Sequence, residues 1–573
     1  MVSASPTAAP SHARGATEPP LIEQTIGALF DAMVERYPER EALVVAHQQR
    51  RYTYRQLQTE ANRLASALLG LGLSPGDRVG IWSHNNAEWV LMQLATAKAG
   101  LVLVNINPAY RTAEVEYALN KVDCKALVTM PRFKTSDYIG MLRELAPEWA
   151  HAKAGEPLES QTLPHLKHAI WIDVAGEGAD ERGFMRFSDL IQRGDPADER
   201  VARIARLLHP RDPINVQFTS GTTGFPKGAT LTHRNILNNG FFIGEAMKLT
   251  HEDRLCIPVP LYHCFGMVLG NLAVLTHGGC IVYPNDAFDA LTVLQTVQAE
   301  KCTGLHGVPT MFIAELDHPD FAKYDLSTLR TGIMAGSPCP VEVMKRVQAD
   351  MNMAEVTIAY GMTETSPVSC QSSTDTPLDK RVSTVGLVQP HLEIKIIDPD
   401  SGQTVPRGAT GELCTKGYSV MQGYWGDDAR TREAIDAEGF MHTGDLATMD
   451  DEGYVNIVGR IKDMVIRGGE NVYPREIEEF LYRHPQIQDV QVVGVPDQKF
   501  GEELCAWIIA KPGQTLDEAG VREFCKGNIA HYKVPRYMKF VDAFPMTITG
   551  KIQKFRIREL MQEELGLSEQ KTA

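Results

Sequence analysis

A ten-residue string rich in hydroxyls and glycines is the part of this sequence best suited to chemistry. It reads Thr219-Ser220-Gly221-Thr222-Thr223-Gly224-Phe225-Pro226-Lys227-Gly228. Glycine lets a backbone approach a ligand closely, and hydroxyl and amide groups donate hydrogen bonds to anionic oxygens. The string is not a Walker loop, because Lys227 follows a proline and precedes Gly228 rather than Ser or Thr. A flexible surface linker is the alternative, but the pattern favours a loop that closes over a polyphosphate.

Further short strings with polar, glycine and charged residues follow this loop along the chain. In order, they are Pro260–Gly266 (PLYHCFG), Ala335–Pro338 (AGSP), Tyr360–Glu364 (YGMTE), Gly411–Leu413 (GEL), Thr443–Asp445 (TGD), Gly459–Asp463 (GRIKD), Gly468–Asn471 (GGEN) and Pro545–Ile552 (PMTITGKI). Together with the loop they resemble the motifs of the adenylate-forming (AMP-binding) superfamily, over about residues 21 to 558. Residues 218–221 and 260–267 look most like medium-chain fatty-acyl-CoA synthetases, the acyl-CoA synthetase family member 2 group.

The resemblance implies a two-step ligase reaction that uses ATP, Mg²⁺ and coenzyme A. A carboxylate attacks the α-phosphate of ATP and releases pyrophosphate, and the thiol of coenzyme A then displaces AMP. A simple carboxylic acid is already ionised at neutral pH, so the first step needs electrostatic stabilisation and no general base. The resemblance makes Lys551 the candidate for that stabilisation. Thr363 would bond the α-phosphate, and Glu364 is a hard oxygen ligand suited to Mg²⁺.

The resemblance also assigns residues to each substrate. Tyr360 would stack on adenine, Asp445 would accept hydrogen bonds from the ribose, and Arg460 would support ribose or phosphate. The expected ATP-binding set is Thr219, Ser220, Gly221, Thr222, Thr223, Gly224, Lys227, Gly336, Ser337, Tyr360, Gly361, Thr363, Asp445, Arg460 and Lys551. The expected acyl pocket is His263, Phe265, Val308, Gly336 and Gly361. The expected thioester loop is Gly468, Gly469 and Glu470, with a hinge at Lys462.

Several of these residues have a purely structural alternative when each is taken alone. His263 could be a satisfied core histidine, Tyr360 a core residue and Asp445 a turn residue. Lys551 could be an ordinary surface lysine. Cys264 has no partnered Cys/His/Asn set around it, which indicates tunnel lining rather than a nucleophile. The joint pattern favours the functional assignments.

Composition excludes several other classes of protein. The 573 residues carry a formal net charge of −15, which argues against a nucleic-acid binder. The ten cysteines are scattered without a C-x-x-C pair, so we expect reduced thiols in a cytoplasmic-type compartment rather than disulfides or zinc. The most apolar stretch, Cys264 to Leu275, is too short to span a membrane. An N-terminal mitochondrial address is the minority alternative, and oligomeric state is not readable.

Alternating helix and strand patterns through most of the first 400 residues predict an α/β fold with largely parallel sheets. We expect a disordered tail over 1–20 and a large N-terminal domain of α/β layers over 21–459 that binds ATP and acid. This domain includes a small β-rich subdomain in 391–459. A hinge over 460–463 would lead to a small, mobile α+β C-terminal domain over 464–573.

These motifs predict the class of reaction, but they do not predict which acid is the substrate. Only 22 residues follow Lys551, so we expect no attached carrier domain, and free coenzyme A is the expected acceptor. A fatty acid, of medium chain length, is the expected substrate. An aryl-acid ligase, or an enzyme that loads a separate carrier protein, stays open. A non-catalytic nucleotide sensor would be expected to have lost Lys551, Glu364 or Asp445, and a P-loop kinase would need a G-K-[ST] motif, which is absent.

Overall fold

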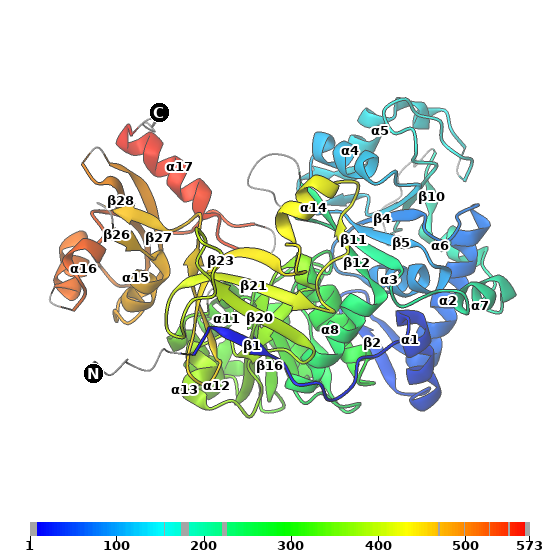
Figure 1. The fold of residues 1–573 in the computed structure, drawn as a ribbon. Helices are drawn as coiled ribbons and strands as arrows, with labels where there is room; N and C mark the ends of the chain where they lie inside the picture. The colour runs from blue at the N-terminus through cyan, green and yellow to red at the C-terminus, as the bar shows by residue number, and fades with distance from the viewer. Residues whose placement is uncertain are drawn as a thin grey trace.

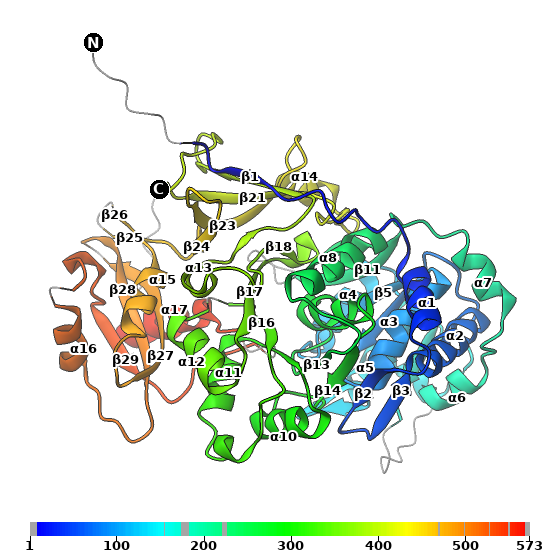
Figure 2. The ribbon, with the colours of Figure 1, turned by 90° about the horizontal axis from the view of Figure 1, so that it is seen from below.

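A computed structural model describes residues 9–153, 155–173, 183–219, 226–337, 339–467, 470–497, 499–526, 528–547 and 551–567. Its main body contains two large sheets that are mostly parallel (Figures 1 and 2). The first has the order β10 (Met185–Arg186), β9 (His168–Trp171), β6 (Ala126–Thr129), β4 (Arg78–Trp82), β5 (Val102–Asn105), β11 (Pro213–Thr219), β12 (Lys227–Thr232) and β22 (Gly423–Tyr424). The second has the order β19 (Leu387–Val388), β18 (Val368–Gln371), β17 (Glu355–Gly361), β16 (Thr331–Ala335), β15 (Gly304–Gly307), β13 (Arg254–Cys256), β14 (Cys280–Tyr283), β2 (Glu41–Val45) and β3 (Arg50–Thr53). The predicted α/β fold class is confirmed.

Helices pack on both large sheets, and α3 (Ala87–Ala99) shows why some lie in the interior. All of its residues are buried, and a helix that is buried on every side belongs in a core. Asn86 caps its first turn and Gly100, with φ of 69°, ends it. The other helices of the body are α1 (Ile26–Arg36), α2 (Tyr54–Gly70), α4 (Thr112–Lys121), α5 (Tyr138–Leu145), α6 (Phe187–Gln192), α7 (Glu199–Ala205), α8 (His233–Ala246), α9 (Ala273–Leu275), α10 (Ala290–Glu300), α11 (Pro309–Leu316), α12 (Val341–Asp350), α13 (Leu378–Ser383) and α14 (Asp428–Ala434).

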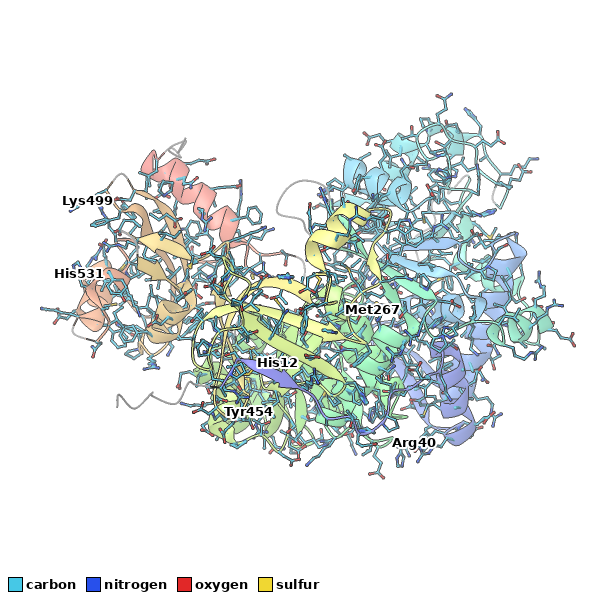
Figure 3. All side chains as sticks on the ribbon, in the orientation of Figure 1. His12, Arg40, Met267, Tyr454, Lys499 and His531 are labelled. Atoms are coloured by element: carbon cyan, nitrogen blue, oxygen red, sulfur yellow. The ribbon has the colours of Figure 1, made fainter. Side chains whose placement is uncertain are left out.

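A five-stranded sheet forms the β-rich subdomain, and the N-terminus contributes to it. Its order is β1 (His12–Arg14), β20 (Leu392–Ile397), β21 (Gly411–Gly417), β23 (Met441–Met449) and β24 (Val455–Arg460). The expected disordered tail over 1–20 is therefore wrong for residues 12–14. β1 pairs antiparallel with β20, and His12 contacts Glu393 at 2.6 Å. The label of His12 in Figure 3 marks this strand. Partners nearly 400 residues away stabilise a segment that has no helix or strand pattern of its own.

The C-terminal part forms a separate α+β unit with its own core (Figure 1). Its sheet has the order β26 (Glu470–Val472), β25 (Val465–Arg467), β28 (Gly501–Ala510) and β27 (Ile487–Asp497), and β29 (Tyr537–Phe540) pairs with β28. Its helices are α15 (Pro474–Leu481), α16 (Glu518–Cys525) and α17 (Lys554–Leu565). Figure 3 labels Lys499 and His531 on this unit and Met267 in the main body.

Between the two parts the chain makes one tight turn after β24. The amides of Asp463 and Met464 both donate to the carbonyl of Arg460 at 3.0 Å, and Ile461 N donates to Gly444 O at 3.0 Å. Lys462, the expected hinge residue, lies in this turn. A side-chain contact also joins the two parts, because Gln488 Nε2 donates to Asp317 Oδ2 at 3.1 Å.

Candidate active site

The hydroxyl-rich loop connects two paired strands at one edge of the predicted site. Thr219 ends β11 and lies opposite Lys227, the first residue of β12. Ser220, Gly221, Thr222, Thr223 and Gly224 fall outside the described residues, so only the two ends of the loop can be placed. Thr219 Oγ1 donates to Glu364 Oε1 at 3.2 Å. The loop therefore starts beside the carboxylate expected to hold Mg²⁺.

Glu364 lies in the short helical turn η4 (Thr363–Thr365) and is only 5% exposed. A second hydroxyl, that of Tyr424 on β22, donates to the same oxygen, Oε1, at 2.9 Å. The Lys227 ammonium lies 4.7 Å from the centroid of the Tyr424 ring. Sequence reasoning missed Tyr424, because its strand is only two residues long and far from η4 in the chain. A buried carboxylate held by hydroxyl donors fits a hard cation such as Mg²⁺.

Asp445 on β23 is held from two sides. Tyr360 Oη donates to Asp445 Oδ2 at 2.7 Å, and Arg460 Nε donates to Asp445 Oδ1 at 3.2 Å. Asp445 and Arg460 are register partners on β23 and β24, which explains their contact. Burial raises the pKa of Asp445, and the Arg460 guanidinium opposes that rise. Tyr360 and Arg460 therefore fix the carboxylate of Asp445, the residue predicted to accept hydrogen bonds from the ribose.

Lys551 enters the same region from the C-terminal unit. Its backbone closes a turn with Thr547, because Thr547 N donates to Lys551 O at 2.7 Å and Lys551 N donates to Thr547 Oγ1 at 3.0 Å. Its Cε lies 3.6 Å from the position a Cβ would take on Gly336. Burial lowers the pKa of Lys551, and the charge of Arg460 lowers it further. The negative charges of Asp445 and Glu364 raise the pKa of Lys551, so this lysine shares one electrostatic environment with both carboxylates.

Gly336, at the end of β16, has φ of 91°, a backbone conformation that favours glycine. A Cβ there would lie 3.1 Å from Val308 Cγ1, so these two expected pocket residues are neighbours. Gly361 is glycine for a different reason. The carbonyl oxygen of Pro367 lies 1.8 Å from where its Cβ would be. Ser337 follows Gly336 directly, and Thr363 lies close enough to the Cys264 thiol to lower its pKa.

His263 and Phe265 lie at the start of η2 (Phe265–Leu272), an eight-residue π-helix. Phe265 N donates to His263 Nδ1 at 3.2 Å, and burial followed by the charge of Lys551 lowers the pKa of His263 to about 3. The imidazole is therefore neutral at physiological pH. Cys264 is buried, with its pKa raised to about 12 mainly by burial, which agrees with a lining role and not with a thiolate nucleophile.

Buried polar side chains hold the π-helix in place. His306 on β15 contacts Leu269 O through Nε2 at 2.9 Å and accepts from Ile333 N through Nδ1 at 3.2 Å. Gln93 on α3 donates to Met267 O at 3.1 Å. π-Helical turns are rare and occur often at functional sites. Little in the sequence indicates this element, since a short apolar run is equally consistent with a strand or an α-helix.

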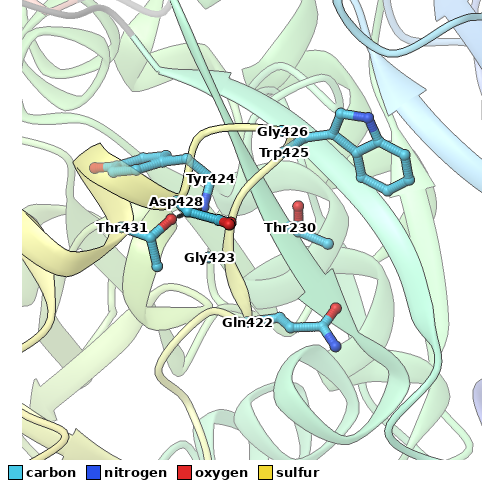
Figure 4. Close-up of a pocket in the computed structure, with 8 residues that line it drawn as sticks. All are labelled: Thr230, Gln422, Gly423, Tyr424, Trp425, Gly426, Asp428 and Thr431. Atoms are coloured by element: carbon cyan, nitrogen blue, oxygen red, sulfur yellow. Dashed lines mark hydrogen bonds between the residues drawn. The ribbon is translucent and has the colours of Figure 1, made fainter.

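Of the predicted thioester loop, the structure describes only the backbone of Glu470, which begins β26 and pairs with Arg467. Gly468 and Gly469 fall outside the described residues. A hollow of about 340 Å³ lies beside β12, β22 and α14 (Figure 4). Its lining is Thr230, Gln422, Gly423, Tyr424, Trp425, Gly426, Asp428 and Thr431. Tyr424 thus has a hollow near its ring and Glu364 at its hydroxyl.

Comparison with known proteins decides the family. The model of the AMP-binding enzyme family matches residues 30–425, and that of the AMP-binding enzyme C-terminal domain matches residues 476–551. The chain belongs to the AMP-binding enzyme family. The prediction of an AMP-forming acid–thiol ligase that uses ATP, Mg²⁺ and coenzyme A is confirmed.

Relatives of this AMP-binding enzyme cover nearly its whole length. It is 50% identical to YngI of Bacillus subtilis, named as a candidate acyl-CoA synthetase, over 96% of this chain and 99% of that protein. It is 44% identical to the human mitochondrial medium-chain acyl-CoA ligase ACSF2, over 97% of this chain and 91% of the relative. Among solved structures, the anthranilate CoA ligase AuaEII with anthranoyl-AMP matches at a TM-score of 0.84 and 28% identity, covering 96% of this chain and 99% of that one.

Proposed function

We propose that the protein joins a medium-chain fatty acid to coenzyme A at the expense of ATP. The observation that carries the proposal is the meeting of Lys551, Glu364 and Asp445, from three separate parts of the chain, in one electrostatic environment. The ACSF2 relatives are named medium-chain acyl-CoA ligases, which supports the medium chain length. The neutral His263 beside the apolar start of η2 supports an uncharged acyl group in that position.

In the first step a carboxylate oxygen of the fatty acid forms a bond to the α-phosphorus of ATP, and the bond to pyrophosphate breaks. Lys551 brings a positive charge to the two anions that must approach each other, which is the main demand of phosphoryl transfer. Mg²⁺, held by Glu364, would neutralise charge on the phosphate oxygens. Thr363 and the 219–227 loop would bond those oxygens, and Asp445 would accept from the ribose.

In the second step the sulfur of coenzyme A bonds to the acyl carbon, the bond to AMP breaks, and the thiol proton is released. We propose that 464–573 rotates against 21–459 about 460–463, withdrawing Lys551 and bringing Gly468, Gly469 and Glu470 to the site. The tight turn after Arg460, in which the amides of Asp463 and Met464 both donate to the Arg460 carbonyl, supports a pivot at Lys462. Val308, Gly336, Gly361, His263 and Phe265 would line the acyl pocket.

An aryl acid is the second candidate substrate, because AuaEII is named as an anthranilate CoA ligase. Loading of a separate carrier protein is the second candidate acceptor. We propose a cytoplasmic location, supported by ten free, buried cysteines. The mitochondrial matrix is the alternative, because the ACSF2 relatives are named as mitochondrial proteins. Within the described residues no helix is long and apolar enough to cross a membrane.

Pyrophosphate release measured against a panel of acids tests the proposal. The panel contains acetate, hexanoate to palmitate, benzoate, coumarate and amino acids, each with ATP and Mg²⁺, with and without coenzyme A. We expect turnover with C6 to C12 acids that needs coenzyme A and yields a thioester. Preference for benzoate or coumarate would favour the aryl-acid alternative. Pyrophosphate release without thioester would point to a carrier protein, and no turnover with any acid would refute the ligase.

A further inference from the structure

Three potential metal ligands meet in the β-rich subdomain, outside the set assigned to ATP and acid. Glu412 and Cys414 lie two residues apart on β21, and His442 lies on β23 as the register partner of Cys414. One ligand atom from each lies within 4.8 Å of the other two. A register shift between Glu412 and Cys414 accompanies this convergence, and bulges commonly redirect side chains in this way.

The separations between these atoms are close to those that a tetrahedral metal imposes. His442 Nδ1 lies 2.9 Å from Glu412 Oε2 and 3.7 Å from Cys414 Sγ. Zinc bond lengths imply about 3.3 Å between a nitrogen and an oxygen ligand, and about 3.6 Å between nitrogen and sulfur. Accommodating a metal therefore requires the imidazole and the carboxylate to separate by only a few tenths of an ångström.

The outer partners also fit a metal site. Asp436 Oδ2 lies 3.6 Å from His442 Nε2, the ring nitrogen that faces away from the other two ligands. Glu412 Oε1 accepts from Gly444 N at 2.9 Å, which leaves Oε2 for a metal. A carboxylate on the second nitrogen of a ligating histidine is the usual arrangement. The positive charge of Lys395 would repel a bound cation. Its Nζ lies 3.6 Å from Asp436 Oδ2 and 3.1 Å from Glu438 Oε2, however, and these carboxylates offset that charge.

We propose that Glu412, Cys414 and His442 bind one zinc-like divalent ion, with a fourth position left for water. A thiolate and an imidazole select zinc over Mg²⁺, so this site is distinct from the one at Glu364. Cys414 is 0% exposed, whereas the His442 side chain is 31% exposed, so the ion would enter from the histidine side. The thiol must lose its proton on binding.

The site connects to the nucleotide site through Gly444. Its amide is held by Glu412, and its carbonyl accepts from Ile461. Asp445 follows directly. A metal that fixes Glu412 would therefore fix the part of β23 that presents Asp445, and we expect slower hydrogen exchange over 443–445 when the ion is bound.

Titration of the chelator-treated full chain with Co²⁺, and then with Zn²⁺, tests the site. Excess Mg²⁺ is present throughout, so that the Glu364 position does not take up the added metal. We expect one equivalent of Co²⁺, with the charge-transfer absorption of a thiolate ligand, displaced by Zn²⁺. Slower exchange over 443–445 should accompany Zn²⁺ binding, and unchanged exchange would refute the connection to Asp445.

Matched variants identify the ligands. Cys414→Ser should abolish the charge-transfer band, whereas Cys370→Ser, which alters an equally buried cysteine on β18, should keep it. His442→Gln changes a part-exposed side chain and should weaken Zn²⁺ binding at least about 100-fold, more than the about 10–100-fold loss typical of an outer partner. Asp436→Asn should weaken Zn²⁺ binding by a factor within that outer-partner range. Binding without a thiolate band, or a band that survives in folded Cys414→Ser or His442→Gln, would overturn the proposal.

Discussion

Replacing Tyr424 with phenylalanine removes one of the two hydroxyl donors that hold Glu364 Oε1 in place. The lost bond is 2.9 Å long and ends on a side chain that is only 5% exposed, so water cannot easily replace it. Hydrogen bonds to charged groups contribute about 1.5–3 kcal/mol. Because Thr219 still donates to the same oxygen at 3.2 Å, we expect the lower part of that range. This corresponds to about a 10- to 30-fold fall in adenylation kcat/KM.

The assay is acid- and ATP-dependent pyrophosphate release, measured over a range of free Mg²⁺. If Tyr424 positions a Mg²⁺ ligand, Tyr424→Phe should also raise the Mg²⁺ concentration for half-maximal rate, which a general loss of folding would not do. Tyr418→Phe is the matched control, because the Tyr418 hydroxyl contacts Asn239 and not Glu364. A change of less than twofold in both kcat/KM and Mg²⁺ dependence would refute this role for Tyr424.

Four further predictions concern the moving lysine, its protonation, the thioester loop and the core. Lys551→Ala should lower adenylation about 10³-fold but leave thioester formation from supplied acyl-AMP intact, and equal loss of both would contradict domain rotation. Because the protonated lysine is the stabilising form and its pKa is lowered, adenylation should decline as pH rises through that lowered pKa. Lys551→Arg should move the decline to higher pH, and an unmoved alkaline limb would exclude Lys551 as its source. Gly469→Trp should spare pyrophosphate release and block thioester formation, as two parallel product assays would reveal. Glu315 on α11 is 1% exposed and both of its carboxylate oxygens lack a partner, so burial raises its pKa well above the usual range. Because the pKa of Glu315 is higher in the folded than in the unfolded protein, the free energy of unfolding falls as pH rises. Glu315→Leu should therefore raise Tm more at pH 8 than at pH 5. An equal rise in Tm at both pH values would count against this explanation.

The sequence predicted the elements whose patterning is local. The strands at 41–45, 78–82 and 392–397 and the helix at 87–99 can be recognised from the sequence, because the apolar pattern and the capping residues lie within or directly beside each segment. Helical spacing of apolar residues extends over 21–37, but helix α1 begins only at Ile26, because Thr25 accepts from the Ala28 amide as its cap. One capping side chain decides where the helix begins, and the pattern of apolar residues does not reveal it.

The features of the site that the sequence missed depend on distant contacts. Tyr424 reaches Glu364 only because β22 pairs with β12, and no spacing in the chain indicates that pairing. The π-helix depends on Gln93 and His306, which come from a helix and a strand of different layers. In contrast, Asp445 and Arg460 lie on strands that follow each other in the chain, β23 and β24, and antiparallel pairing places the two residues opposite each other.

Pairing of β1 with β20 has a practical consequence for anyone who shortens this protein. The first 20 residues look dispensable in the sequence, yet removing them would uncover the edge of β20 that pairs with β1 at 393–395, while its other edge stays paired with β21. An uncovered strand edge is a template for pairing with another chain. A protein that starts at residue 21 would therefore be expected to aggregate while its catalytic residues remain intact, and a loss of soluble activity could be mistaken for a catalytic defect.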